Sequence, residues 1–208
     1  MSRPLEKPII YLITNGDADP VNFKLKKREI LEIVRLAAEA GVSMIQIREK
    51  NLAARSLFDL TVGAVEITRK FATRILVNGR ADIALAAGAD GVHLPADGLS
   101  AVVVRRSFPL DFLIGVSTHS AEETLAAKTN GADFVTFGPV FESPGKGKPK
   151  GGEELSRVCN LLDPFPVIAL GGIDESNYRN VLKAGASGFA AIRFLNDEGS
   201  LRGLLTNP

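Results

Sequence analysis

Short apolar stretches alternate with longer amphipathic ones along most of this chain. The apolar stretches predict strands near residues 9–14, 43–48, 74–78, 90–94, 112–116, 133–137, 166–170 and 187–192. Between most of them apolar residues recur at helical spacing, as Ile30, Ile33, Val34 and Ala37 do. Further helices are predicted near residues 53–71, 80–87, 120–129, 151–162 and 175–184. The chain therefore repeats a strand followed by a helix.

A two-residue step that ends in Gly separates several predicted helices from the strands that follow. Gly just past a helix adopts the left-handed conformation without a Cβ penalty. The apolar residues after it are typical of a parallel strand that is buried on both faces. The step occurs at Ala40-Gly41, Ala87-Gly88, Asn130-Gly131 and Ala184-Gly185.

The repeat predicts an α/β fold, a single-domain (β/α)8 TIM barrel that spans residues 1–208. An open, doubly wound sheet is the alternative. It is less favoured because such sheets usually have fewer strands, and because no G-x-G-x-x-G follows the first predicted strand.

Composition narrows the function classes. The chain has 25 Lys and Arg against 24 Asp and Glu, so no whole-molecule field would attract nucleic acid or an acidic membrane, and we expect neither partner. The first apolar run is too short for a signal peptide and no stretch could span a bilayer, which predicts a cytoplasmic protein. The single cysteine, Cys159, excludes an internal disulfide and is expected to pack within a helix.

In a parallel barrel the active site lies at the carboxyl ends of the strands. In MIQIREK, alternation places Gln46 and Arg48 on one side of the strand and Ile45 and Ile47 on the other, with Lys50 just past its end. The isoleucines should face the helices, so Gln46 and Arg48 should face inward. A buried Arg needs a negative partner. We favour a ligand anion, with an ion pair to an interior carboxylate as the alternative.

Other strand ends carry weaker signals. Asn78-Gly79-Arg80 could hold a ligand or simply begin a helix. Gly171 and Gly172 end the seventh strand, where backbone N–H groups could approach a phosphate, and a tight turn is the alternative. The eighth strand ends in GFAAIRF, which places Gly188 and Arg193 nearby.

The fifth and sixth strands add polar groups. Ser117 and His119 follow the fifth strand, and His can move protons near neutral pH. Residues 138–152 are rich in Gly, Pro and Lys, as in a mobile loop that closes on a charged substrate or in a solvated surface loop. His93 is predicted to be a core histidine that is hydrogen-bonded to backbone, with a catalytic role as the alternative.

Several stretches in order resemble the superfamily of thiamine phosphate synthases and TenI-like thiazole tautomerases. They span nearly the whole chain: YLIT, QIREK, VNGRADIALAAGADGVHL, IGVSTHSAEE, GADFVTFGPVF, PVIALGGI and AGASGFAAI. The resemblance implies a (β/α)8 barrel that binds phosphorylated thiazole. It further implies that a synthase joins this thiazole to a pyrimidine pyrophosphate with the help of Mg²⁺.

The resemblance also assigns roles to residues of this chain. The implied pyrimidine and pyrophosphate site consists of Gln46, Arg48, Lys50, Asn78, Ser117 and Lys146. The implied thiazole phosphate site contains Gly172 and Gly188, and we expect Gly171 and Arg193 at the same strand ends to belong to it.

Departures from the family pattern concern the metal. Synthases usually read Asn-Asp-Arg where this chain has Asn78-Gly79-Arg80, and Glu-Asp-Leu where it has Asp97-Gly98-Leu99. Mg²⁺ is usually held through one or two carboxylates and substrate phosphates, so only Asp97 and the substrate remain to hold it. Other departures are Thr14-Asn15 in place of a common Asp, Ser143-Pro144-Gly145 in place of Thr-x-Thr, and Arg193 in place of Ser.

Three functions follow from these comparisons with the family pattern. A metal-independent tautomerase that uses His119 as its general acid and base, with no cofactor, is slightly favoured because both expected metal carboxylates are Gly. A synthase with Mg²⁺ is the first alternative, and a non-catalytic barrel that binds thiazole phosphate is the second. The oligomeric state stays open, a homo-oligomer included.

Overall fold

Eight strands follow one another in chain order around a closed barrel in a computed structural model that describes residues 7–206. The strands are β1 (Ile9–Ile13), β2 (Met44–Ile47), β3 (Arg74–Asn78), β4 (Gly91–Leu94), β5 (Leu113–Thr118), β6 (Phe134–Phe137), β7 (Val167–Leu170) and β8 (Gly188–Ala191). The helices are α1 (Phe23–Glu39), α2 (Ala54–Thr68), α3 (Ala81–Ala86), α4 (Ala101–Ser107), α5 (Ala121–Thr129), α6 (Gly151–Leu162), α7 (Tyr178–Lys183) and α8 (Glu198–Thr206), with a 3₁₀ turn η1 (Phe194–Asn196). The predicted (β/α)8 barrel is confirmed.

The four Gly steps all close helices as predicted. Gly41 has φ 74°, its N–H bonds the carbonyl of Ala38, and the N–H of Val42 reaches back to Ala37. This pair of bonds is the Schellman motif, which requires a left-handed residue. The same pair of bonds forms at Gly88, Gly131 and Gly185, which also have positive φ.

The described chain divides into two compact units. Unit 1 contains the residues up to Ile10 and His93–Ala191, and unit 2 contains Tyr11–Val92 and the residues from Ile192 onward. One domain over residues 1–208 stays a prediction.

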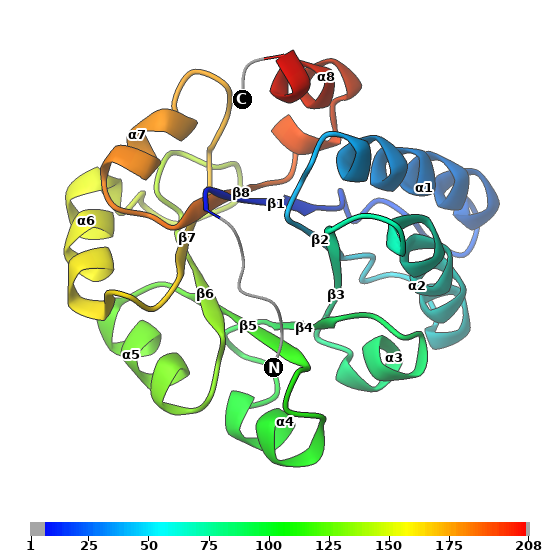
Figure 1. Cartoon of the computed structure of the whole chain (residues 1–208), viewed down its shortest axis with the longest axis horizontal. Helices are drawn as coiled ribbons and strands as arrows, with labels where there is room; N and C mark the ends of the chain where they lie inside the picture. The colour runs from blue at the N-terminus through cyan, green and yellow to red at the C-terminus, as the bar shows by residue number, and fades with distance from the viewer. Residues whose placement is uncertain (1–6, 207–208) are drawn as a thin grey trace. The chain divides into compact units, whose positions relative to one another are not determined.

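In unit 2, β2 pairs in parallel with β1 and β3, in register Tyr11 with Met44 and Met44 with Arg74. Helix α1 lies between α8 and α2, and α3 follows α2 (Figure 1). Leu12, Ile45 and Leu60 are fully buried in this unit's core. The amphipathic stripe predicted from the sequence is buried at Ile30, Val34 and Ala37, as its spacing requires.

In unit 1, β5, β6, β7 and β8 pair in parallel in chain order. The rings of Phe134, Phe137 and Phe189 are buried, and α6 contacts both α5 and α7 (Figure 1). Gly188 begins β8, and a Cβ there would lie 1.9 Å from the carbonyl oxygen of Ile9. Glycine is therefore required at this close backbone approach.

The sequence pattern did not predict three elements. Helix α4 reads AVVVRRS, and its run of Val is more typical of a strand. The turn η1 and helix α8 follow the last predicted strand. No helix within residues 7–206 is both long and apolar enough to cross a bilayer.

Candidate active site

Gln46 is the innermost of the predicted ligand residues in unit 2. It is buried on β2, and its Nε2 donates to the Tyr11 hydroxyl at 2.9 Å. Burial raises the pKa of Tyr11 well above its ordinary range, so this hydroxyl stays protonated. The tyrosine of YLIT therefore orients the amide of Gln46. A Tyr within an apolar predicted strand is the sequence signal for this contact, because a buried Tyr hydroxyl usually needs a hydrogen-bond partner.

Arg48 lies just past the end of β2 and is half-buried. Its backbone N–H donates to Thr14 Oγ1 at 2.8 Å. Among the described residues its guanidinium forms no ion pair, so the interior carboxylate that we weighed as its partner is not found. An unpaired, half-buried guanidinium is suited to a ligand anion.

Glu49 is the residue of this segment that the sequence analysis missed. Its side chain is buried and accepts hydrogen bonds from the Thr14 hydroxyl at 2.5 Å and from the N–H groups of Gly16 and Ala18 at 3.1 and 2.9 Å. One carboxylate thus fixes the segment after β1 to the end of β2. Alternation alone gave no sign of this role, because Glu49 lies beyond the regular strand.

A cavity of about 270 Å³ lies at the carboxyl ends of β2 and β3 in unit 2. Its lining includes the exposed Lys50 and the half-buried Asn78, so the structure brings these two predicted residues together. Gly79 and Arg80 complete that rim, and Gly79 has φ 65°. The guanidinium of Arg80 pairs with Asp82 at 2.7 Å and lowers the pKa of that carboxyl. Lys50 is therefore the cation of this cavity that has no acidic partner among the described residues.

Ser117 and His119 lie at the end of β5 in unit 1. The strand extends to Thr118, so Ser117 is part of it and does not follow it as predicted. Ser117 Oγ lies 2.9 Å from Nε2 of His93, which is buried. His93 is therefore a core histidine, as predicted, and its Nε2 contacts the hydroxyl of Ser117.

His119 is exposed, and its Nδ1 lies 2.7 Å from the carbonyl oxygen of Gly138. Because a carbonyl oxygen only accepts, Nδ1 carries the hydrogen. In the neutral ring this leaves the lone pair on Nε2. His119 therefore has the tautomer of a general base.

The segment after β6 is irregular, as predicted, but its base is anchored. The N–H groups of Val140 and Phe141 donate to Leu170 and Gly171 at 2.9 and 3.0 Å. Lys146, at the exposed tip, forms no ion pair among the described residues. The far end is tied as well, since the N–H groups of Lys150 and Gly151 donate to Pro139 and Val140 at 2.8 and 3.1 Å. Closure of this segment on a substrate stays a prediction.

The segment after β6 packs so closely against residues 171 and 172 that both positions require Gly. Their φ values are 102° and 63°, and a Cβ would lie 2.5 Å from Pro139 Cα and 2.4 Å from the carbonyl oxygen of Glu142, respectively. Packing thus accounts for both glycines, as the alternative of a tight turn suggested. Binding of phosphate by their N–H groups stays a prediction.

The expected position of Gly188 is wrong. It is the first residue of β8, so it lies at the amino end of that strand, where it admits the backbone of Ile9. Arg193 follows the carboxyl end of β8, is exposed, and has no acidic partner among the described residues. Asp97, in unit 1, is also exposed and lies in the turn after β4.

The residues that the structure describes do not fit a metal ion held by the protein. No cluster of three or more acidic, His or Cys side chains among them could hold one. Positions 79 and 98 are Gly, and Glu49, the carboxylate that lines the cavity beside Lys50, already accepts hydrogen bonds from Thr14, Gly16 and Ala18. Neither Gly position therefore supplies the free carboxylate that Mg²⁺ usually takes from a protein.

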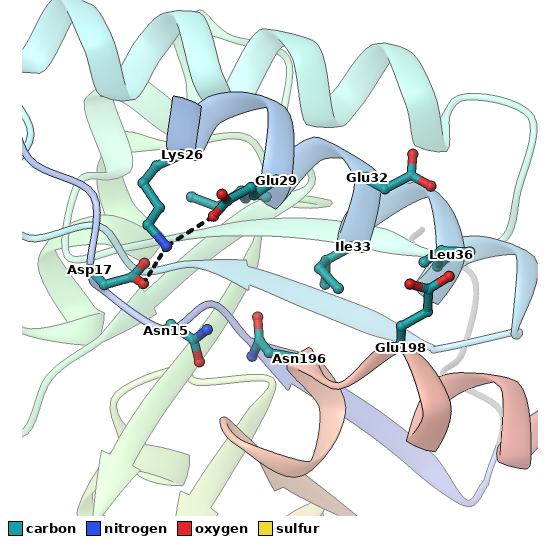
Figure 2. Close-up of a pocket in the computed structure, with 10 residues that line it drawn as sticks. Asn15, Asp17, Lys26, Glu29, Glu32, Ile33, Leu36, Asn196 and Glu198 are labelled. Carbon is teal, nitrogen blue, oxygen red and sulfur yellow. Dashed lines mark ion pairs between the residues drawn. The ribbon is translucent and has the colours of Figure 1, made fainter. Parts of the chain in front are cut away.

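A second cavity in unit 2, of about 310 Å³, contains none of the predicted site residues. It is lined by Asn15, Asp17, Lys26, Glu29, Ile30, Glu32, Ile33, Leu36, Asn196 and Glu198. Figure 2 shows Lys26 between Asp17 and Glu29, at 2.8 and 2.9 Å. Both carboxylates raise the pKa of Lys26. Because the described residues of this lining have four carboxylates and Lys26 as their one cation, the cavity is not suited to an anionic ligand, and we assign the chemistry to the strand ends.

Comparison with known proteins agrees with the motifs at these strand ends. The sequence model of the thiamine monophosphate synthase family matches residues 10–195. A putative thiamine-phosphate synthase of Geobacter sulfurreducens is 44% identical over 186 residues, which cover 88% of this chain and 84% of that protein. A thiamine-phosphate synthase of Chlorobium phaeovibrioides is 40% identical over 189 residues, or 89% of this chain and 85% of that protein.

A solved structure gives the same answer. The thiamine phosphate pyrophosphorylase from Pyrococcus furiosus superimposes with a TM-score of 0.80 at 31% identity, covering 95% of each chain. This barrel with its polar strand ends is thus of the thiamine-pathway enzyme class. The chain belongs to the thiamine monophosphate synthase family.

The slight preference for a tautomerase is not supported by these comparisons. The similar proteins have the synthase name, and the synthase alternative fits better. The two Gly positions are compatible with a synthase, since Lys and Arg side chains can also stabilise the pyrophosphate that the reaction releases.

Proposed function

We propose that this chain is a thiamine-phosphate synthase that joins hydroxymethylpyrimidine pyrophosphate to thiazole phosphate with release of pyrophosphate. The observation that carries the proposal is the cavity at the ends of β2 and β3, because both Lys50 and Asn78 line it. An unpaired ammonium and an amide donor are suited to pyrophosphate oxygens.

The electrostatics of unit 2 support the same assignment. Departure of pyrophosphate builds negative charge, and cations fixed in advance stabilise that charge as it develops. Lys50 and Arg48 have no acidic partner among the described residues, and the backbone of Arg48 is fixed through Thr14. Gln46, oriented by Tyr11, is proposed to bind the pyrimidine ring.

Unit 1 contains further residues to which we assign ligand roles. Ser117 and Lys146 are proposed to bind the pyrimidine pyrophosphate. The N–H groups of Gly171 and Gly172 are proposed to bind the thiazole phosphate, and in unit 2 Arg193 is proposed as a phosphate-binding cation. Gly188 is better explained by packing against Ile9.

The dependence of the reaction on Mg²⁺ is tested directly. The family resemblance implies that a synthase uses Mg²⁺, whereas the described residues contain no group of three or more His, Cys, Asp or Glu side chains that could hold a metal ion. The purified chain is incubated with both substrates, with Mg²⁺ and with a chelator, and thiamine phosphate is measured. Product formation supports the proposal. Absence of product from protein that binds thiazole phosphate would overturn it and favour a binding-only barrel.

Lys50→Ala tests the cavity itself. We expect kcat/KM for the pyrimidine pyrophosphate to fall about 100-fold, the loss typical of one preorganised charge at a developing anion. Lys24→Ala is the matched control, because Lys24 is exposed on α1 and lines neither cavity. Equal activity of the two variants would remove Lys50 from the site.

A second activity, relocation of a proton on a carboxylated thiazole phosphate, is favoured by one observation. His119 Nδ1 is held by Gly138, which leaves Nε2 for proton transfer. His119→Ala should abolish any such tautomerisation while leaving phosphate affinity nearly intact. Tautomerase turnover that persists in this variant would exclude His119 from the mechanism.

A further inference from the structure

His93 is a buried imidazole that the proposed mechanism does not use. It lies on β4 with 2% of its surface exposed. Its Nε2 lies 2.9 Å from Ser117 Oγ on β5 and 3.4 Å from Thr136 Oγ1 on β6. These two hydroxyl residues are register partners on neighbouring strands, so one ring nitrogen contacts a pair of adjacent hydroxyls within unit 1.

The surroundings hold this ring in place. A Cβ at Gly115 would lie 2.8 Å from His93 Nδ1 and 2.4 Å from Cζ of Phe134. Gly115 therefore makes the space that both rings fill. The Phe134 ring is tilted against the imidazole with centroids 6.0 Å apart. Close packing on these sides leaves the imidazole little freedom to turn away from Ser117.

Ser117 differs from Thr136 in what its hydroxyl can still do. Thr136 is buried, whereas Ser117 is half-buried. Among residues 7–206, the hydrogen-bond partner of Ser117 Oγ is His93. A hydroxyl has one donor and two acceptor positions, and the imidazole occupies one of these three. The two remaining hydrogen-bonding positions of the Ser117 hydroxyl can bind a ligand, and His93 already holds its oxygen in place.

We propose that His93 is a positioning residue that fixes the Ser117 hydroxyl for the pyrimidine pyrophosphate. The inference rests on the proposed function for the identity of this ligand. His93 acts through Ser117 and does not itself touch the substrate. A fixed hydroxyl loses less rotamer freedom on binding than a free one, so the contact strengthens ligand binding.

A double-mutant cycle tests whether His93 acts through Ser117. His93→Leu removes the hydrogen bond, and Ser117→Ala removes the hydroxyl. We expect His93→Leu alone to raise KM for the pyrimidine pyrophosphate about tenfold with little change in KM for thiazole phosphate. In the Ser117→Ala protein, the same change should alter KM less than twofold. Equal effects in both backgrounds would overturn the inference.

Further variants separate positioning from packing. His93→Gln, whose amide can reach the position of Nε2, should restore most of the affinity. Thr136→Val should leave both KM values within twofold, because the inference assigns no ligand role to Thr136. If His93→Leu does not fold, His93→Asn takes its place, since its amide ends short of Ser117. A rise in both KM values with either variant would indicate a general packing defect and overturn the inference.

Failure of the proposed function is distinguishable from failure of this inference. If the wild-type chain makes no thiamine phosphate, the synthase proposal fails. The same cycle is then measured as the Kd of hydroxymethylpyrimidine pyrophosphate by calorimetry. Coupling between the two substitutions supports the role of His93, and additivity or absence of binding overturns it.

Discussion

The hydroxyl of Thr14 bridges two neighbours at the end of β2: it accepts the backbone N–H of Arg48 and donates to the carboxylate of Glu49. Glu49 is buried and Arg48 is half-buried. The proposed pyrophosphate cation is therefore placed by a network of hydrogen bonds that includes the segment after β1. Stability and ligand binding are expected to depend on the same carboxylate.

Glu49→Ala should lower the free energy of unfolding by about 3 kcal/mol, because the Thr14 hydroxyl and two N–H groups lose a charged acceptor. Glu39→Ala, which breaks an exposed pair with Arg35, is the control and should cost about 0.5 kcal/mol. Urea unfolding measures both variants. Similar losses in the two would show that the Glu49 network contributes little.

Gly188→Ala should destabilise the chain strongly, by about 3 kcal/mol or more, because its Cβ would lie 1.9 Å from a backbone oxygen that cannot move aside easily. Gly152→Ala is the matched control within α6, where a Cβ meets nothing within 4 Å. Thermal melting compares the two. A folded Gly188→Ala protein with unchanged stability but weakened phosphate binding would instead restore the ligand role implied by the family resemblance.

Gly79→Asp should create Mg²⁺-dependent binding of inorganic pyrophosphate in the cavity beside Lys50 and Asn78, with at least a tenfold gain in affinity over the unaltered chain. The left-handed φ of 65° is tolerated by Asp better than by most residues. Gly79→Asn has the same shape without the charge and should show no gain. Calorimetry with and without Mg²⁺ decides, and equal affinities for both variants would contradict our account of this glycine.

Alkaline pH should destabilise the chain partly through Cys159. Burial raises the pKa of its thiol from 9.0 to about 11, and Lys7 lowers it to a smaller extent. Because the folded pKa lies above the unfolded one, the stabilisation is complete below pH 9 and is lost as pH rises towards 11. The stability of the wild-type chain relative to Cys159→Ala should therefore fall by about 2 kcal/mol between pH 8 and 11. A constant difference would show that the folded thiol ionises like an exposed one.

The sequence by itself determined the barrel and the position of its strand ends. The spacing of apolar residues and the two-residue steps that end in Gly are local signals. Gly41 shows why they suffice, because a left-handed helix cap followed by an apolar strand can be recognised without any distant partner. The motif QIREK likewise placed Arg48 and Lys50 beside one strand end. Helix α4 was missed because its Val residues favour a strand locally, and packing overrides that preference.

Only the tertiary structure decided which residues serve one another. Glu49 meets Thr14 across 35 positions of the chain, and His93 meets Ser117 across 24. The sequence predicts a phosphate ligand at Gly188, whereas the structure shows why Gly is needed there, since a Cβ would lie 1.9 Å from the carbonyl oxygen of Ile9. Hydrogen bonds and close approaches between distant residues leave no periodic signal in a single sequence. The chain thus specifies its fold through local chemistry, whereas its site is specified by contacts that form only when the barrel closes.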